Sequence, residues 1–168
     1  GGTSVLFTDL AARYGLVLPE LESRVQEKIG LKISSVNTST ANPVDLGFYG
    51  FDFTIMGHTI EAMAQDEAID VIIPYFSLDF ITSFQSDQVE SGPHAIVEAF
   101  RKTDKPVVPI LSRFTENMVD VEKVRIRFTE LFRKAGLAVY NTPQDAIASI
   151  SGFLGWKRHA GRVAAGDA

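Results

Sequence analysis

The sequence has no cysteine. Disulfides, thiolate zinc sites and cysteine nucleophiles are therefore excluded, and we expect a cytoplasmic protein. No apolar run approaches the roughly 18 to 20 residues that a membrane helix requires, and the N-terminus lacks the layout of a signal peptide. The sequence does not begin with Met, so we expect it to be part of a longer polypeptide.

The chain also lacks an excess of basic residues. Its 16 Lys and Arg face 21 Asp and Glu, giving a formal net charge of -5. The basic residues gather only weakly, at 125–134 and 157–162, where a solvated helix face explains them. Nucleic-acid binding is therefore not expected. A length of 168 residues with 45% hydrophobic residues predicts one domain with a single well-buried core.

Short apolar runs alternate with helical patterns along the chain. The runs 69–73 and 107–111 are continuous and rich in β-branched residues, which is typical of strands covered on both faces. This alternation predicts a doubly wound α/β fold with a parallel sheet and helices on both faces. The expected strands are 16–18, 69–74, 107–111 and 137–140, and the expected helices are 5–14, 53–65, 93–103, 118–135 and one that begins at Pro143.

Residues 31–52 break this alternation and predict a long loop, a feature that is often functional. Asn42, Asp45 and Gly47 are the candidate loop or interface residues within it. The alternative for Asp45 is a carboxylate that binds nearby backbone in a turn. Asp52 is expected to cap the following helix.

The first helix follows Gly1-Gly2-Thr3-Ser4. A helix start built from bare backbone presents unpaired N–H groups and the positive end of the helix dipole, so it suits a phosphate or another anion. The alternative is that the glycines only permit a tight turn into a core helix.

The order of several motifs resembles one family. These motifs are the Gly-Gly helix start, Tyr-Gly-Leu-Val-Leu-Pro-Glu-Leu, Asn-Pro-Val-Asp-Leu, Asp-Val-Ile-Ile, Lys-Pro-Val-Val and Ala-Gly-Leu-Ala-Val-Tyr-Asn-Thr-Pro-Gln-Asp-Ala. Together they resemble the NDP-forming acyl-CoA synthetases, relatives of succinyl-CoA synthetase and ADP-forming acetyl-CoA synthetase. The resemblance covers residues 1 to about 156 and implies the flavodoxin-like CoA-ligase domain, with residues 1–154 as the domain and 155–168 as the start of a linker.

The resemblance implies a mechanism shared between domains. The family moves a phosphoryl group from an acyl phosphate to a histidine and then to ADP or GDP, and two helix N-termini hold the phosphohistidine. By position, Gly1, Gly2, Thr3 and Ser4 match one of these helix starts. No catalytic residue is implied in this domain, which we expect to be inactive alone.

The resemblance also implies cofactors and partners. The whole enzyme would use CoA, ATP/ADP or GTP/GDP, and Mg, with none of them bound by this domain alone. The implied partners are a CoA-binding domain that carries the phosphohistidine and an ATP-grasp domain, in the same chain or in a partner subunit, and the whole enzyme is expected to be an oligomer.

Two features depart from the family pattern. The family has a strand before the glycine-rich turn, and this sequence starts after it, so the first strand is expected to be missing. Residues 46–52 contain Phe48, Tyr49 and Phe51 where many relatives carry small residues. These aromatic side chains argue against a phosphate contact there and are expected to pack on a neighbouring domain.

Several other residues could suggest chemistry. The family's phosphorylated histidine lies in another domain, and His58, His94 and His159 are interpreted as solvated or capping histidines without metal-ligand spacing. Three carboxylates occupy the polar segment after the expected strand and are interpreted either as interface or site residues or as simply exposed: Asp79, Asp87 and Glu90. For Trp156, packing at a domain boundary is expected, and the alternative is stacking on a ligand.

Two other functions stay open at this point. One is a non-catalytic scaffold or regulatory module, as in relatives in which a synthetase-like region is fused to a protein acetyltransferase. The other is a free-standing flavodoxin-like binder of a nucleotide or flavin, although the Thr/Ser-rich loop expected before its first helix is not visible.

Overall fold

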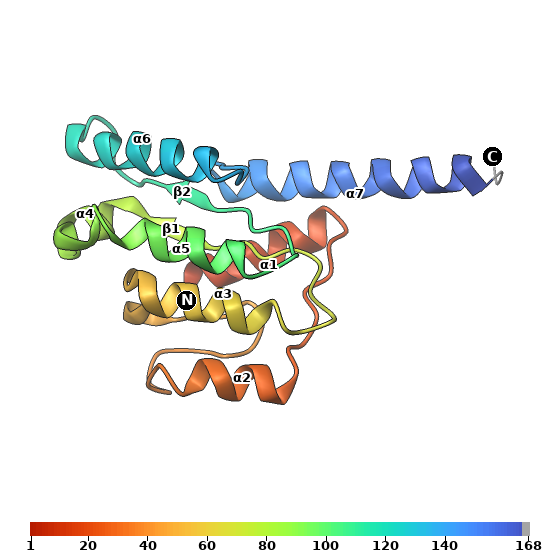
Figure 1. Ribbon diagram of the computed structural model, residues 1–168, viewed down its shortest axis with the longest axis horizontal. Helices are drawn as coiled ribbons and strands as arrows, with labels where there is room; N and C mark the ends of the chain where they lie inside the picture. The colour runs from red at the N-terminus through yellow and green to blue at the C-terminus, as the bar shows by residue number, and fades with distance from the viewer. Residues whose placement is uncertain (166–168) are drawn as a thin grey trace.

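The computed structural model describes residues 1–165, and its side chains are described as far as Ala160. Helices dominate this part of the chain and surround a small parallel sheet (Figure 1). The elements are α1 Gly2–Arg13, α2 Ser23–Gly30, α3 Phe53–Met63, β1 Tyr75–Ser77, α4 Leu78–Phe84, α5 Gly92–Arg101, β2 Ile110–Ser112, α6 Val119–Lys134 and α7 Pro143–Ala165, with 3-10 turns at Gly47–Phe51 and Ser86–Gln88.

The sheet forms from three of the predicted segments. Strand β1 pairs in parallel with β2, with Tyr75 opposite Ile110. Isolated parallel bridges extend the pairing from Ile72 to Val107 and from Ile110 to Tyr140. Segments 69–77, 107–112 and 137–140 therefore lie side by side in that order, as a doubly wound fold requires.

The expected strand at 16–18 is wrong as a paired strand. Gly15, with φ of 68°, and the Leu16 amide, which donates to the Ala11 carbonyl at 2.9 Å, complete the C-terminus of α1. The residues that follow are irregular and make no ladder with β1. A strand is defined by hydrogen bonds to a neighbour, and a cavity separates this segment from β1.

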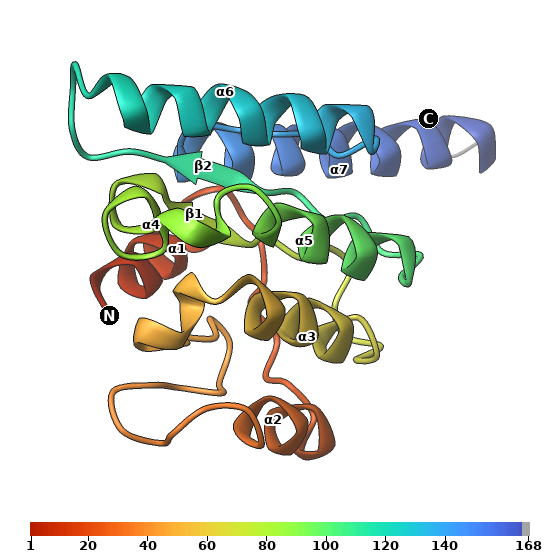
Figure 2. The ribbon, with the colours of Figure 1, turned by 60° about the vertical axis from the view of Figure 1, so that its left-hand side comes forward.

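Both faces of the sheet are covered, which confirms the predicted α/β fold. On one face, Phe76 of β1 stacks on Phe53 of α3 at 5.7 Å between ring centroids and lies 6.1 Å from Phe132 of α6. On the other face, Ile110 of β2 packs with Ala146 of α7. In Figure 2, α6 lies in front of α7, the strands and α5 lie below them, and α3 and α2 lie lower still.

Local signals explain most helix ends. Asp52 caps α3 as predicted, because its Oδ1 accepts from the amides of Thr54 at 2.8 Å and Ile55 at 3.3 Å. The Oγ1 of Thr142 accepts from the Asp145 amide at 3.1 Å and caps α7. Helix α7 continues through Gly155 to Ala165, where a linker was expected, and the last part of that expected linker, 166–168, lies outside the described residues.

Two helices were not predicted. Helix α2 buries only Val25 and Ile29, so its apolar stripe is too short to give a helical period. Helix α4 lies in the segment after the predicted 69–74 strand, for which no helix was predicted, and it buries Leu78 and Ile81. The long loop was predicted correctly for residues 31–46, where only a single bridge joins Ser39 and Asp45.

Candidate functional site

A cavity of about 770 Å³ lies between α1, α3, α7 and the segment 68–75 that leads into β1. It extends along the whole length of that segment. At the carboxyl end of β1 it meets the start of α1, the loop 42–47 and the side chains of Ser77 and Phe80. In open α/β sheets this edge is where ligands bind.

The start of α1 forms one wall of this end of the cavity. Gly1 is the N-cap residue and provides no side-chain cap. The amides of Gly2, Thr3 and Ser4 donate no hydrogen bond within the described residues. A Cβ at Gly2 would meet nothing within 4 Å, so the space beside Gly2 is open. The predicted helix start therefore combines free donors with the positive end of the helix dipole, roughly half an elementary charge.

The loop candidates lie beside the start of α1. Asp45 lies beside Gly1, with Oδ2 4.0 Å from the position of a Cβ there, and its Oδ1 accepts from the Gly47 amide at 2.9 Å. The contact with Gly47 is the turn-type hydrogen bond that the sequence offered as the alternative role of Asp45. Asn42 donates through Nδ2 to the Pro19 carbonyl at 3.0 Å. Gly47 has φ of 55°, and a Cβ there would lie 2.6 Å from the Asn37 carbonyl oxygen, so only glycine fits.

Two polar groups that follow β1 are relevant to the site. Ser77 is 8% exposed and lines the cavity, and its Oγ is buried without a hydrogen-bond partner in the described part of the chain. Such orphaned hydroxyls are uncommon in native proteins. Asp79 accepts from the amides of Phe114 at 2.7 Å and Thr115 at 3.0 Å, and from the Thr115 hydroxyl. Asp79 therefore fixes the loop after β2 beside the cavity.

The pKa of Asp79 lies below its usual value. Burial by itself would raise it, but hydrogen bonds from the Thr115 side chain and from the backbone amides of Phe114 and Thr115 stabilise the charged carboxylate and lower the pKa overall. Asp79 is a structural acceptor in this arrangement, because its oxygens are already occupied by donors.

Asp79→Asn is expected to lower the free energy of unfolding at pH 7 by about 1 kcal/mol, because a charged acceptor is lost. When folding lowers the pKa of a carboxyl, the stabilisation that this carboxyl gives to the fold is fully present above its pKa in the unfolded chain, about 3.9. This stabilisation is lost as the pH falls through the pKa of the carboxyl in the folded protein. Urea unfolding at pH 7 and pH 3 should therefore show a smaller effect of the substitution at pH 3. Asp87→Asn, at an exposed position, is the control, and an effect of Asp79→Asn that is equal at both pH values would contradict this role.

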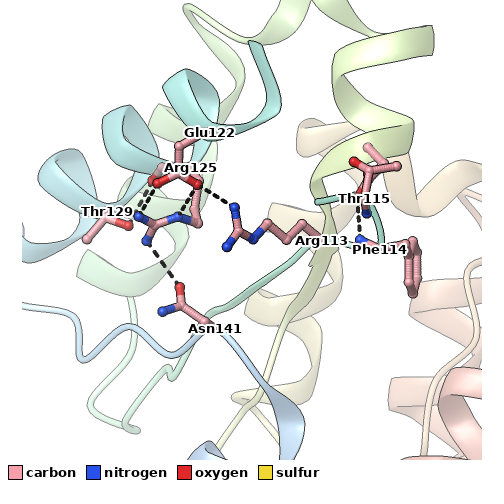
Figure 3. A network of polar contacts seen from close by, with 8 residues as sticks. Arg113, Phe114, Thr115, Glu122, Arg125, Thr129 and Asn141 are labelled. Atoms are coloured by element: carbon pink, nitrogen blue, oxygen red, sulfur yellow. Dashed lines mark hydrogen bonds and ion pairs between the residues drawn. The ribbon is translucent and has the colours of Figure 1, made fainter. Parts of the chain in front are cut away.

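A second polar network holds the same edge of the sheet (Figure 3). Glu122 of α6 accepts from Arg125 at 2.5 Å and from Arg113 at 3.0 Å. Arg125 also donates to Asn141 at 3.3 Å, next to the start of α7. Hydrogen bonding and charge from Arg125 lower the pKa of Glu122, and Glu122 raises the pKa of Arg125. The network links the loop after β2, helix α6 and the turn before α7. Sequence reasoning missed it because these three segments are distant in the chain.

Five phenylalanines form a continuous group at this edge, which we name the aromatic patch: Phe48, Phe51, Phe80, Phe84 and Phe114. Neighbouring rings lie 5.4 to 6.3 Å apart between centroids. Phe48 is 67% exposed, Phe84 61% and Phe114 63%. Phe51, Phe80 and Phe114 also line the cavity, so the patch is continuous with it. Contiguous exposed apolar surface of this kind marks an interaction site.

The other candidate residues lie away from the cavity. His58 of α3 is partly buried, with Nε2 3.1 Å from the carbonyl oxygen of Lys28 in the last turn of α2. His94 and His159 are exposed. Glu90 pairs with Arg127. Trp156 is exposed and lies 5.8 Å from Phe153 on α7.

The described residues contain no group of three or more His, Cys, Asp or Glu that could hold a metal ion. Across residues 1–165, none of the helices is both long enough and apolar enough to cross a membrane.

No protein-family model and no curated protein matches the chain. Among solved structures, the dinucleotide-forming acetyl-coenzyme A synthetase 1 of Ca. Korarchaeum cryptofilum superimposes on the entire chain and on 34% of its own length, with a TM-score of 0.73 and 20% identity. The same protein in complex with phosphate and ADP gives a TM-score of 0.73 and 19% identity over 33% of its length. PH0766 from Pyrococcus horikoshii OT3 matches 90% of this chain and 32% of its own, with a TM-score of 0.70 and 23% identity. The chain thus has the fold of one domain in these proteins and spans about a third of their length.

Proposed function

We propose that this chain is the flavodoxin-like CoA-ligase domain of an NDP-forming acyl-CoA synthetase. The observation that carries the proposal is the structural match of this entire chain to one third of an acetyl-coenzyme A synthetase, together with an uncapped helix start at the carboxyl edge of the sheet. The ordered motifs of the sequence support the same assignment. In the whole enzyme, acyl-CoA formation would be reversible and coupled to phosphorylation of ADP or GDP.

Within that enzyme, Gly1, Gly2, Thr3 and Ser4 would hold the phosphoryl group of a phosphohistidine that another domain carries. The free amides of Gly2, Thr3 and Ser4 would donate to the phosphoryl oxygens. A helix terminus stabilises a nearby anion by roughly 0.3 to 2 kcal/mol, depending on burial. This positions the phosphoryl group, which is the main contribution that phosphoryl transfer requires of a protein.

The remaining site residues would shape this pocket. The orphaned hydroxyl of Ser77 is available to donate a further hydrogen bond at the cavity wall. Asp45, Gly47 and Asn42 would fix the loop beside the helix start. The metal, the nucleotide and CoA would be held by the other domains. The domain would contribute electrostatic stabilisation and no nucleophile or base.

The aromatic patch would provide the contact with the domain that carries the phosphohistidine. It borders the same cavity as the start of α1, so a domain that places a histidine there must lie against it. Exposed phenylalanines lose water when they are covered, which favours association. The proposed partners, a CoA-binding domain and an ATP-grasp domain, fit a chain that spans a third of its structural relatives.

The assignment is tested by giving the full-length protein ATP or GTP, CoA and a panel of short carboxylic acids. Formation of an acyl-CoA thioester together with ADP or GDP and phosphate is the expected result. Hydroxamate trapping and nucleotide chromatography measure the two products. Absence of thioester with every acid and both nucleotides would contradict the assignment.

One observation favours the alternative of a non-catalytic scaffold or regulatory module. Asp45 places a carboxylate beside Gly1, with Oδ2 4.0 Å from the position that a Cβ would take there, and a negative charge at this place opposes phosphate binding. In a scaffold, the thioester assay would give no product while the fold remained intact.

A further inference from the structure

Helix α7 has an exposed apolar face in the described part of the chain. Phe153 and Trp156 lie exposed on this face, with their rings 5.8 Å apart between centroids. In Figures 1 and 2 the C-terminal half of α7 projects past the other elements. The opposite face of the helix packs on the molecule and lines the cavity through Ile147, Ile150 and Leu154. The exposed face is therefore open to another molecule.

Two glycines of α7 serve no packing role within the described chain. A glycine in the middle of a helix costs roughly 1 kcal/mol relative to alanine. A Cβ at Gly152 or at Gly155 would meet nothing within 4 Å, so neither position requires glycine for space. Gly152 lies one helical turn before Trp156 and on the same face, whereas Gly155 directly precedes Trp156 and points about 100° away from it. Gly152 therefore lets a second helix approach closely beside the exposed rings.

One side of α7 carries a row of residues that we name the α7 stripe: Ser149, Gly152, Phe153, Trp156 and Ala160. They follow one another at helical spacing, so they lie along one face. Ser149 precedes Gly152 by about one turn and Trp156 follows it by about one turn. Two antiparallel copies of α7 that cross at Gly152 therefore place each Trp156 over the other copy's Ser149, a large side chain over a small one. The stripe is complementary to a second copy of itself.

The charges of α7 favour the same orientation. Asp145 is exposed in the first turn of the helix, and Lys157, Arg158 and His159 are exposed near the other end of the stripe. An antiparallel pair brings the basic end of each copy beside Asp145 of the other, where opposite charges attract. A parallel pair would place the two basic ends together, and such juxtaposed like charges oppose association.

We infer that a second copy of this chain docks on the α7 stripe, in an antiparallel helix pair that crosses at Gly152. The same surface is used by both copies, so the assembly closes as a twofold dimer. One helix face buries less area than an obligate interface, so the dimer is expected to be reversible. The stripe faces away from the cavity, so this inference is independent of the proposed enzyme function and leaves the cavity of each copy accessible.

Disulfide cross-linking between copies tests the inference in the full-length protein. Gly152→Cys places a thiol at the proposed crossing point, and Gly155→Cys, at an equally open position of the same helix, is the matched control. Because a disulfide requires two Cα atoms within about 7 Å, oxidation with copper phenanthroline is expected to link residue 152 of two copies at least about tenfold faster than residue 155. Peptide mass spectrometry identifies the linked residues, and thermal unfolding verifies that both variants are folded.

A second variant tests the contribution of the aromatic side chain. Adding Trp156→Ser to Gly152→Cys is expected to slow the cross-link at least about tenfold, because a central interface tryptophan contributes about 2 kcal/mol or more. An unchanged rate would contradict the predicted packing of Trp156 on Ser149.

Three further outcomes would overturn the inference. Equal cross-linking rates for Gly152→Cys and Gly155→Cys would show random collision between copies. Resistance of the Gly152→Cys thiol to both cross-linking and alkylation would show that another domain of the same polypeptide covers the stripe. Binding to vesicles of anionic phospholipid that depends on Phe153 and Trp156, without a cross-link at 152, would assign the stripe to a membrane surface.

Discussion

Gly2→Asp is expected to slow acyl-CoA formation by the full-length protein about 100-fold while leaving the domain folded. At about 5 Å and an effective dielectric constant near 20, two unit negative charges repel by about 3 kcal/mol, which corresponds to roughly 100-fold. The side chain has room, because a Cβ at Gly2 meets nothing within 4 Å. An aspartate in the first turn also favours the helix, so the free energy of unfolding should not fall.

Gly2→Asn is the matched control for this prediction. Asparagine has the shape of aspartate without its charge and is expected to retain activity to within about tenfold, since it adds only a neutral side chain. The rate of thioester formation and the unfolding transition are measured for both variants. Equal losses of activity in the two variants would show that Gly2 has a steric role and would contradict an anion site at the start of α1.

Replacing the three most exposed members of the aromatic patch, Phe48, Phe84 and Phe114, with serine is expected to slow acyl-CoA formation at least tenfold. Interface aromatic residues contribute about 1 to 2 kcal/mol each when a partner covers them. In the uncovered chain the three side chains are 67%, 61% and 63% exposed, so their loss should change the free energy of unfolding little. Steady-state kinetics and thermal unfolding measure the two effects separately.

The control for the patch is the exposed pair on α7. Phe153→Ser with Trp156→Ser removes apolar surface that is 59% and 64% exposed but lies outside the patch. This variant is expected to keep wild-type activity. If it loses as much activity as the patch variant, or if the patch variant is fully active, the patch is not the contact surface for the domain that carries the histidine.

The sequence predicts the sheet and most of the helices because their signals are local. The β-branched run that contains Ile72 and the run that contains Val107 pair as expected. Asp52 is adjacent to the helix it caps, and so is Thr142. The start of α1 and the loop around Asp45 were both singled out from sequence, and the structure places them together at one end of the cavity.

The features that sequence reasoning missed depend on contacts between distant segments. Phe51, Phe80 and Phe114 come from three separate parts of the chain, so their contact follows from the fold and not from spacing. The orphaned hydroxyl of Ser77 is visible only when its surroundings are known. The run Leu16–Leu18 was predicted as a strand from composition, but strand formation depends on a neighbour that supplies hydrogen bonds.

In the proposed enzyme, the start of α1 holds the phosphoryl group of a phosphohistidine that another domain carries. The most direct measurement is to incubate the full-length protein with ATP labelled at the γ-phosphate and to map the labelled residue by mass spectrometry. The account predicts label on one histidine outside residues 1–168, removed by added ADP and formed more slowly in Gly2→Asp than in Gly2→Asn. Label on His58, His94 or His159, or no labelled histidine at all, would contradict it.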